Sequence, residues 1–323
     1  MNIGIIGLGL IGGSLGLDLR SQGHYVWGVS RKQETCKRAV ADGAIDAASQ
    51  NLDLIPYLHD TDIVFICTPI QAILPTLAEL RDKLAPRTIV ADVGSVKAAI
   101  VNQAAKMWPL FVGCHPMAGT QFSGIAAAER NLFQGRPCVI TDPELSDLDP
   151  DPAIEMPSQD DRTSINQPSQ EEQSQAKQEQ DLLNLGISYQ DAKAKVKSLW
   201  QSIGAAVIEC SPADHDRAVA WISHLPVITS ASLIMACGKE PKKDISELAK
   251  QLASSGFRDT SRVGGGNPEL GRLMAEYNRD ALLYCLQAYQ QNLQLLIDQI
   301  QAQQWPELEA NLSHTQQERL FYI

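Results

Sequence analysis

The sequence lacks the features that mark secreted, metal-binding and nucleic-acid-binding proteins. Its seven cysteines form no C-x-x-C pair and have no regular spacing, so we expect neither a disulfide framework nor a metal site. Scattered thiols of this kind are typical of a reducing cytoplasm, where we expect the protein to reside. The formal net charge is −11, and most of it lies in residues 142–181, where Arg162 and Lys177 are the basic residues. No basic face for nucleic acid is evident.

Charged residues are missing from one stretch, which could be mistaken for a membrane span. Residues 218–237 carry no formal charge, but they include His224, Pro226 and four hydroxyl side chains, which are costly in lipid. A buried helix near an active site explains this stretch better. The short apolar run at residues 3–6 fits a strand, so we expect no signal peptide there.

A strand, a glycine-rich turn and a helix are predicted at the start of the chain. The apolar residues 3–6 precede three glycines at G-x-G-x-x-G spacing, and a helical run covers residues 14–20. The first glycine allows a tight turn, the second lets a pyrophosphate approach bare backbone, and the third lets the helix pack close to the strand. We therefore predict a dinucleotide site, with the phosphates at the helix N-terminus, formed by Gly7, Gly9, Leu10, Ile11 and Gly12.

The second predicted strand, residues 25–30, ends without an acidic residue. An NAD enzyme usually has Asp or Glu there to bind the ribose 2′-hydroxyl, whereas this chain has Ser30, Arg31 and Lys32. A hydroxyl and two cations suit a 2′-phosphate, which a carboxylate would repel. The sequence thus favours NADP over NAD. The alternative is that Arg31 and Lys32 only begin a solvated helix.

Strand-like and helical runs alternate over the first 140 residues, which predicts an α/β fold with a parallel sheet and crossover helices. An acidic segment rich in Ser, Gln and Pro, at about residues 143–190, has too little apolar surface to fold, and we expect a flexible insertion. A helix at 192–202 and a strand at 205–210 complete the predicted Rossmann-type NADP-binding domain, residues 1–211. The predicted strands lie at residues 3–6, 25–29, 63–67, 88–91, 111–113 and 137–140, and predicted helices at 71–84 and 97–107.

Helical periodicity dominates from residue 212 onward, and strand signals vanish. Apolar residues recur along one helical face over residues 269–303. Such a face suits packing against helices of this chain and of a second copy. We therefore predict an all-helical substrate and dimerisation domain over residues 212–323, and a homodimer.

Three polar clusters follow predicted strands. They are Thr68-Pro69, residues 92–97 and residues 113–120. Active sites in open α/β sheets lie beyond the carboxyl ends of the strands, so these clusters converge on one crevice. We expect Thr68 and Pro69 to contact the cofactor, and His115 to lie beside its nicotinamide.

Six motifs along nearly the whole chain, outside the acidic insertion, point to one family. They are Gly-Leu-Gly-Leu-Ile-Gly-Gly-Ser (7–14), Asp-Val-Gly-Ser-Val-Lys (92–97), His-Pro-Met-Ala-Gly (115–119), His-Asp (215–216), Ser-His-Leu-Pro (223–226) and Gly-Phe-Arg-Asp-Thr-Ser-Arg (256–262). Together they resemble the prephenate/arogenate dehydrogenases of tyrosine biosynthesis. The expected NADP preference and Met117 are most like the cyanobacterial-type arogenate branch.

The resemblance implies oxidative decarboxylation of arogenate to tyrosine, with hydride transfer to NADP. It makes His115 the base that accepts the substrate's hydroxyl proton, a task that suits an imidazole near neutral pH. Ser95 would hydrogen-bond both this imidazole and the substrate hydroxyl. We expect His215 to be structural, as a contact at the start of a helix.

The resemblance also implies the residues that bind the substrate. Arg262 would anchor a carboxylate through its bidentate guanidinium, and Arg258 would assist or pair with Asp259. His224 would be a second substrate-pocket residue. Gln121 stands where prephenate-type relatives often carry Glu, and it gives no physical argument for or against the amine of arogenate.

Three alternatives remain open from the sequence. The first is the same fold acting as a prephenate dehydrogenase. The second is a β-hydroxyacid dehydrogenase, which would need a catalytic lysine, whereas the helical domain offers no obvious candidate. Lys239, Lys242 and Lys243 lie in a polar turn that contains a proline. The third is a non-catalytic NADP-sensing module that binds a partner through the acidic insertion. The intact His115, Ser95 and Arg262 argue against that module. The expected ligand is a small molecule, with no nucleic acid or membrane partner.

Overall fold

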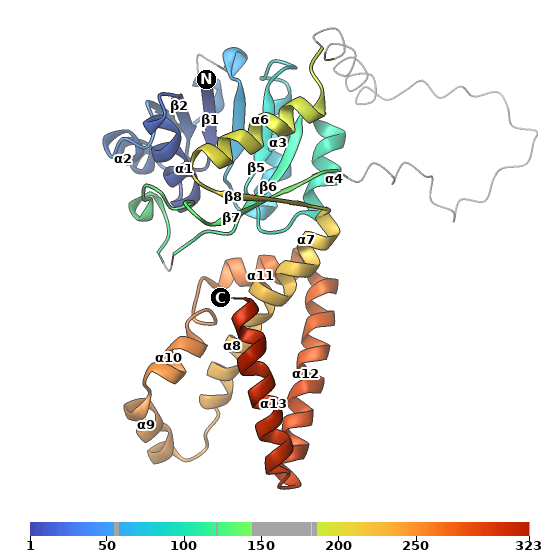
Figure 1. Cartoon of the computed structure of the whole chain (residues 1–323). Helices are drawn as coiled ribbons and strands as arrows, with labels where there is room; N and C mark the ends of the chain where they lie inside the picture. Colours follow the sequence, from blue (N-terminus) through green and yellow to red (C-terminus); the bar gives the residue numbers. More distant parts are fainter. Residues whose placement is uncertain (55–57, 121, 144–181, 183–185, 323) are drawn as a thin grey trace, which may run out of the picture. The chain divides into compact units, whose positions relative to one another are not determined.

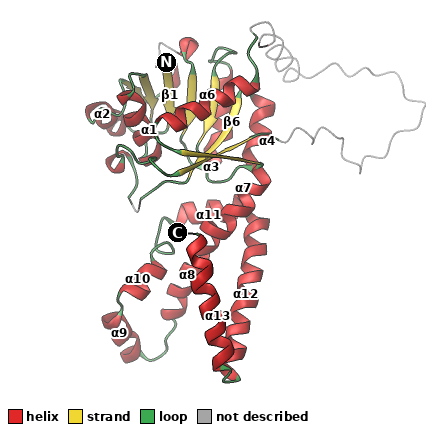
Figure 2. Ribbon diagram, in the orientation of Figure 1, coloured by secondary structure: helices red, strands yellow, loops and turns green. Residues whose placement is uncertain are grey.

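The computed structural model describes residues 1–54, 58–120, 122–143, 182 and 186–322 (Figures 1 and 2). The chain divides into two compact units, Met1–Asp216 and Arg217–Ile323. The sequence placed this division at residue 211. Gln121 and most of the predicted insertion at 143–190 lie outside the described residues.

An eight-stranded sheet forms the centre of the first unit, in the order β3-β2-β1-β4-β5-β6-β7-β8. All neighbouring strands pair in parallel except β6 and β7, which are antiparallel. The strands are β1 (Asn2–Ile6), β2 (Tyr25–Val29), β3 (Ala47–Ser49), β4 (Ile63–Ile66), β5 (Ile89–Asp92), β6 (Phe111–Pro116), β7 (Pro137–Thr141) and β8 (Ala206–Cys210).

The predicted parallel sheet is confirmed, except that β7 runs antiparallel to β6. A parallel return needs a long crossover, usually a helix. The described part of the connection between β6 and β7 contains only a short 3-10 helix, Ile125–Ala127, so the chain returns antiparallel. The sequence also missed β3, because Ala-Ala-Ser has none of the β-branched or aromatic side chains that favour strands.

Helices cover both faces of this sheet. They are α1 (Leu10–Ser21), α2 (Gln33–Ala41), α3 (Ile70–Arg81), α4 (Ala98–Met107) and α6 (Tyr189–Ser202). The strand order runs outward in both directions from the β1–β4 pair, and right-handed crossovers therefore place α1 and α2 on one face and α3 and α4 on the other. Ligands of such sheets bind at this reversal, beyond the carboxyl ends of the strands.

The core of the first unit consists of apolar strands covered on both sides. Every residue of β4 and β5 is buried, as expected for central parallel strands. Two buried indoles find hydrogen-bond acceptors: Trp27 donates to Thr61 Oγ1 at 3.2 Å, and Trp108 donates to the Thr88 carbonyl at 2.8 Å. These contacts satisfy the polar atoms that Trp27 and Trp108 bring into the core.

The second unit is helical, as predicted. Helix α7 (Pro212–Val219) crosses the division and continues through a π-helical turn, Ala220–His224, into α8 (Leu225–Cys237). Pro226 lacks the N–H that an α-helical ladder needs, and the wider π turn ends two residues before it. The other helices are α9 (Lys243–Leu252), α10 (Ser255–Ser261), α11 (Pro268–Tyr277), α12 (Arg279–Gln301) and α13 (Trp305–Glu318).

Much apolar surface of the second unit is exposed within one copy of the chain. The continuous helix Pro212–Cys237 is long and apolar enough to cross a membrane, but one such helix is weak evidence for a membrane protein. Only 28% of its most apolar window is buried, so the expectation of a buried helix is wrong for the single chain. The reason is that α8 is apolar on several faces, while the small core of this unit (Ala220, Leu225, Leu282 and Cys285) covers only part of them.

Candidate active site

The glycine-rich turn between β1 and α1 is a cradle of bare backbone. Gly7 has a φ of +103°, which favours glycine. A Cβ on Gly12 would lie 2.1 Å from the Gly7 carbonyl oxygen, so the helix packs directly on the turn, whereas a Cβ on Gly9 would meet nothing within 4 Å. Helix α1 begins at Leu10 without a side-chain cap. The N–H groups of its first turn, including that of Ile11, therefore suit phosphate oxygens.

The end of β2 presents a hydroxyl and two cations. The Ser30 N–H donates to the Ser49 carbonyl of the neighbouring strand at 3.1 Å. Arg31 and Lys32 are exposed, and neither forms an ion pair with another described residue. Lys32 also precedes the first residue of α2, so the sequence's alternative of a solvated helix start fits this position as well.

The end of β4 lies against the glycine-rich turn. The Cys67 N–H donates to the Ile6 carbonyl at 2.7 Å, and a Cβ on Gly7 would lie 3.1 Å from the Thr68 nitrogen. Pro69 precedes the first residue of α3. The Thr68 Oγ1 is buried and has no hydrogen-bond partner among the described residues. A polar ligand seated at this turn would therefore find a hydroxyl ready to bond.

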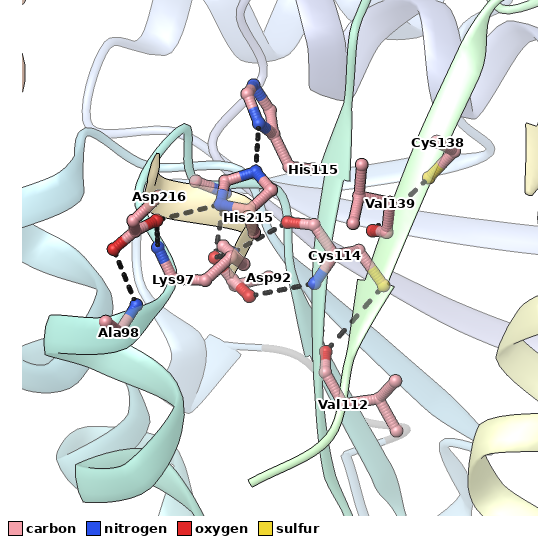
Figure 3. A network of polar contacts seen from close by, with 11 residues as sticks. Asp92, Lys97, Ala98, Val112, Cys114, His115, Cys138, Val139, His215 and Asp216 are labelled. Atoms are coloured by element: carbon pink, nitrogen blue, oxygen red, sulfur yellow. Dashed lines mark hydrogen bonds and ion pairs between the residues drawn. The ribbon is translucent and has the colours of Figure 1, made fainter. Parts of the chain in front are cut away.

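His115, near the end of β6, heads a chain of three side chains (Figure 3). Its Nδ1 lies 2.8 Å from Nε2 of His215, and His215 Nδ1 lies 2.7 Å from Oδ1 of Asp216. A carboxylate only accepts hydrogen bonds, so His215 carries its hydrogen on Nδ1 and, as a neutral ring, accepts at Nε2. The Nδ1 of His115 must then donate. Its lone pair is left on Nε2, the atom that can act as a base.

The start of α7 positions His215 and Asp216. The Ser211 Oγ accepts the Asp214 N–H at 3.0 Å, and Pro212 occupies the first helical position. His215 also makes the expected contact at the helix start, because its N–H donates to the Ser211 carbonyl at 3.0 Å. Its ring does more than the structural role that the sequence suggested. The signal in the sequence was this capped helix start followed directly by a His-Asp pair.

A buried ion pair holds the strand that carries His115. Asp92 and Lys97 are fully buried and paired, and the Lys97 Nζ also donates to the Cys114 carbonyl at 2.7 Å. The Asp92 Oδ1 accepts the Cys114 N–H at 3.2 Å. The peptide groups on both sides of Cys114, which directly precedes His115, are therefore fixed to the end of β5 and the loop after it (Figure 3).

The Asp216 carboxylate joins this ion pair to the histidines. It accepts the N–H of Lys97 at 2.8 Å and that of Ala98 at 2.9 Å. Helix α4 has no cap from its own N-terminal side chain, so Asp216 caps it from 118 residues further along the chain. A negative charge is favourable at a helix N-terminus. The carboxylate thus accepts two backbone N–H groups while it orients His215.

Ser95 lies in the loop between β5 and α4. Its Oγ is buried and makes no hydrogen bond to any other described residue, so the expected bond to the His115 imidazole is not formed here. The Nδ1 of His115 is bonded to His215, so a hydroxyl that bonds to this imidazole would have to reach Nε2.

The predicted substrate residues that the structure describes lie in the second unit. His224 is 1% exposed, and the Asn278 amide donates to its Nδ1 at 3.1 Å, which leaves the hydrogen of a neutral ring on Nε2. Arg258 lies 3.5 Å from Asp259, the ion pair that the sequence offered as its alternative role. Arg262 is exposed and directly follows α10. Gln121 lies outside the described residues.

Cysteine and metal chemistry find no support in the part of the chain that the structure describes. All seven cysteines are free, and no group of three potential metal-ligating side chains occurs there. Burial raises the pKa of the Cys114 thiol to about 12, and it also raises the pKa values of Cys67 and Cys138. These thiols stay protonated and are poor nucleophiles.

Comparison with known proteins identifies relatives along the whole chain. Residues 15–152 match the nucleotide-binding domain of prephenate dehydrogenase, and residues 211–314 match its dimerization domain. The solved structure of Synechocystis arogenate dehydrogenase is 48% identical, covers 100% of both chains and has a TM-score of 0.76. Prephenate dehydrogenase from A. aeolicus, solved in complex with hydroxyphenyl propionate and NAD+, shares the fold at 22% identity, with 100% and 98% coverage and a TM-score of 0.80.

A curated relative is longer than this chain. Prephenate dehydrogenase of Bacillus subtilis is 29% identical over 285 residues, which are 86% of this chain. The match spans 64% of the B. subtilis protein.

Proposed function

The chain belongs to the prephenate dehydrogenase family, and on this premise we propose that it is an NADP-dependent arogenate dehydrogenase of tyrosine biosynthesis. The substrate loses a hydride from its hydroxyl-bearing ring carbon and loses its ring carboxylate as CO2, which gives tyrosine. The observation that carries the proposal is the 48% identity over the whole length to Synechocystis arogenate dehydrogenase. Aromatisation of the ring makes the reaction effectively irreversible.

His115 is the general base of the proposed reaction. As the hydride leaves the ring carbon, the hydroxyl on that carbon becomes acidic. The lone pair on His115 Nε2 accepts its proton, since Nδ1 is bonded to His215. Ser95 binds the substrate hydroxyl and fixes it against the imidazole, a role supported by its buried Oγ, which has no hydrogen-bond partner among the described residues.

Residues of the second unit bind the rest of the substrate. Arg262 anchors a carboxylate through its bidentate guanidinium, and Arg258, one helical turn earlier, assists it. His224 offers Nε2–H to a substrate oxygen, because its Nδ1 accepts from Asn278. Gln121, which belongs to the first unit and lies outside the described residues, is the remaining member of the proposed set.

The first unit fits a pyridine dinucleotide with a 2′-phosphate. Gly7, Gly9 and Gly12 shape a bare turn beneath the first N–H groups of α1, around Leu10 and Ile11. Ser30, Arg31 and Lys32 bind the 2′-phosphate, while Thr68 and Pro69 contact the nicotinamide half. When bound, the dinucleotide supplies the hydride acceptor. The chain itself positions the substrate and holds the proton.

We also propose that the protein works as a homodimer in the cytoplasm. The match of residues 211–314 to a dimerization domain supports the dimer, as do the exposed apolar side chains of the second unit. Those on α9 are Ile245, Leu248 and Leu252, and those on α12 include Tyr289, Leu293 and Ile300. A second copy would cover part of this surface.

The name of the B. subtilis relative supports a second candidate, the same chemistry on prephenate. The non-catalytic sensing module is not favoured, because the histidine and serine of the site are intact. The test measures formation of reduced nicotinamide with arogenate or prephenate, each with NADP or NAD. Turnover restricted to arogenate and NADP supports the proposal in full. Equal kcat/KM for both substrates rules out arogenate specificity, and NADP binding without any turnover contradicts the enzymatic function.

A further inference from the structure

We propose that His215 and Asp216 are positioning residues that hold His115 as a base at Nε2 and share the positive charge that it acquires. The three side chains then act as a two-imidazole relay that ends on a buried carboxylate. The proposal rests on the proposed function, in which His115 is the general base. It goes beyond that function by assigning Nε2 of His115 as the reactive nitrogen and His215 and Asp216 as the residues that keep it unprotonated and able to accept a proton.

The direction of the relay follows from its last member. Two neutral imidazoles alone could donate to one another in either sense. Asp216 removes this freedom, because its Oδ1 accepts from His215 Nδ1 at 2.7 Å and also from the Lys97 N–H at 2.8 Å. His215 Nε2 is therefore the acceptor for His115 Nδ1. The hydrogen bond made by one ring nitrogen fixes the role of the other.

Burial explains why the base needs a charged partner. His115, His215 and Asp216 are 9%, 2% and 5% exposed, so water offers little stabilisation for a protonated ring. A buried cation without a counter-charge is costly. The other charges of the network, Lys97 and Asp92, neutralise each other. Asp216 is the charge that balances a proton held on either imidazole.

The proton balance of the proposed reaction also favours a relay that exchanges no proton with solvent. The O–H bond of the substrate breaks as an N–H bond forms on His115 Nε2, and the hydride leaves the ring carbon with its electron pair for the oxidised nicotinamide. The C–C bond to the carboxylate then breaks, CO2 departs, and the pair enters the ring, so that the oxygen takes the proton back as a phenol. No net proton is released. The relay needs only to hold a proton and return it.

Two variants of His215 separate positioning from simple packing. In His215→Gln the side-chain amide oxygen can still accept the hydrogen of His115 Nδ1, whereas in His215→Leu nothing can accept it. We expect His215→Leu to lower kcat about ten- to a hundredfold, by analogy with the loss seen when the hydrogen-bond partner of a metal-ligating imidazole is removed. KM and NADP affinity should change little. We expect His215→Gln to recover most of kcat, with His59→Gln, on an exposed histidine, as the control.

The pH profile should respond as well. His215→Leu removes the acceptor that stabilises the protonated His115, so protonation becomes harder. The acid limb of kcat/KM should therefore move to lower pH, with a lower plateau. A purely structural role for His215 would lower the plateau without moving the limb.

Nitrogen NMR of the histidine rings tests the relay without activity. In the unmodified protein at neutral pH, His115 should show a hydrogen-bearing Nδ1 and a bare Nε2, assigned from the signals that vanish in His115→Asn. A hydrogen on Nε2 would overturn the proposal even if His215→Leu failed to fold. So would full kcat with an unchanged pH profile in a folded His215→Leu protein. If His115→Asn kept its activity, the proposed role of His115 as base would fail instead.

Discussion

The backbone N–H of Lys97 donates to the side chain of Asp216 at 2.8 Å, across 119 positions of sequence. This bond joins two parts of the site. On one side, Lys97 and Asp92 grip the peptide groups before His115; on the other, Asp216 orients the histidine that bonds to it. The position of the base is thus set by groups from β5, the start of α4, β6 and α7 together.

Replacement of His115 by Asn should lower kcat and leave NADP binding unchanged. A general base contributes about 10²–10⁴-fold, so kcat should fall by about that factor. The dissociation constant for NADP, measured by nucleotide titration, should stay within error, because the cradle of Gly7, Gly9 and Gly12 is untouched. His59→Asn, on an exposed histidine, is the matched control. A parallel loss of NADP binding would show that His115 has been given the wrong role.

Replacement of Ser30 by Asp should shift the cofactor preference toward NAD. A carboxylate at the end of β2 accepts from a ribose 2′-hydroxyl and repels a 2′-phosphate. The ratio of kcat/KM for NADP to that for NAD should fall, with the larger change on the NADP side. Arg31→Ala should weaken NADP without improving NAD. A ratio left unchanged by both variants would support the view that Arg31 and Lys32 merely begin a solvated helix.

The sequence predicted the parts of the fold that depend on local pattern. The apolar run at residues 63–67 gave β4, the glycine spacing gave the turn before α1, and the helical period gave α12. The prediction failed for elements whose structure depends on partners that are distant in the sequence. The direction of β7 depends on how the chain returns to β6, and the short strand β3 is held by its pairing with β2.

The residues of the site also differ in whether their roles could be predicted from local sequence. His115 could be chosen from its place at the end of a strand, because that is a local property. The roles of His215, Asp216 and Lys97 could not, since each depends on a partner far away in sequence. Lys97 was visible as part of a motif, but its burial against Asp92 and the Cys114 carbonyl could not be read from spacing. The bond from His115 to His215 spans 100 positions.

Replacement of Arg262 by Ala should raise the KM for arogenate and leave kcat less affected. A carboxylate anchor contributes to substrate binding throughout the reaction, and its loss appears mainly in KM. Arg262→Lys should restore little, since an ammonium lacks the bidentate geometry. Arg272→Ala, on an exposed arginine that pairs with Glu276, is the control. An unchanged KM in Arg262→Ala would transfer the role to Arg258 or His224.

Replacement of Lys97 by Met should destabilise the first unit. The change leaves the Asp92 carboxylate buried and without its cation, and breaking a buried pair costs about 3–5 kcal/mol. The free energy of unfolding, measured with denaturant, should fall by about that amount. The double variant Asp92→Asn, Lys97→Met should recover part of it, because no lone charge remains buried. A single variant as stable as the unmodified protein would mean that water reaches the site.

Replacement of Glu209 by Gln should lower stability at neutral pH, with a defined pH dependence. Lys193 and Lys197 hydrogen-bond its carboxylate from α6 and lower its pKa to about 2. A carboxyl whose pKa is lower in the folded protein stabilises the fold above its unfolded pKa, and this contribution is lost as the pH falls through the folded value. Thermal unfolding should therefore show a gap in Tm between the unmodified protein and Glu209→Gln at pH 7. The gap should close between about pH 4, the unfolded carboxyl range, and pH 2.

Because Glu209 is 38% exposed, high salt should shrink the gap at pH 7. Glu318→Gln, an exposed glutamate on α13, should show no such gap, and a gap that persists below pH 2 would exclude the ion pair as its cause.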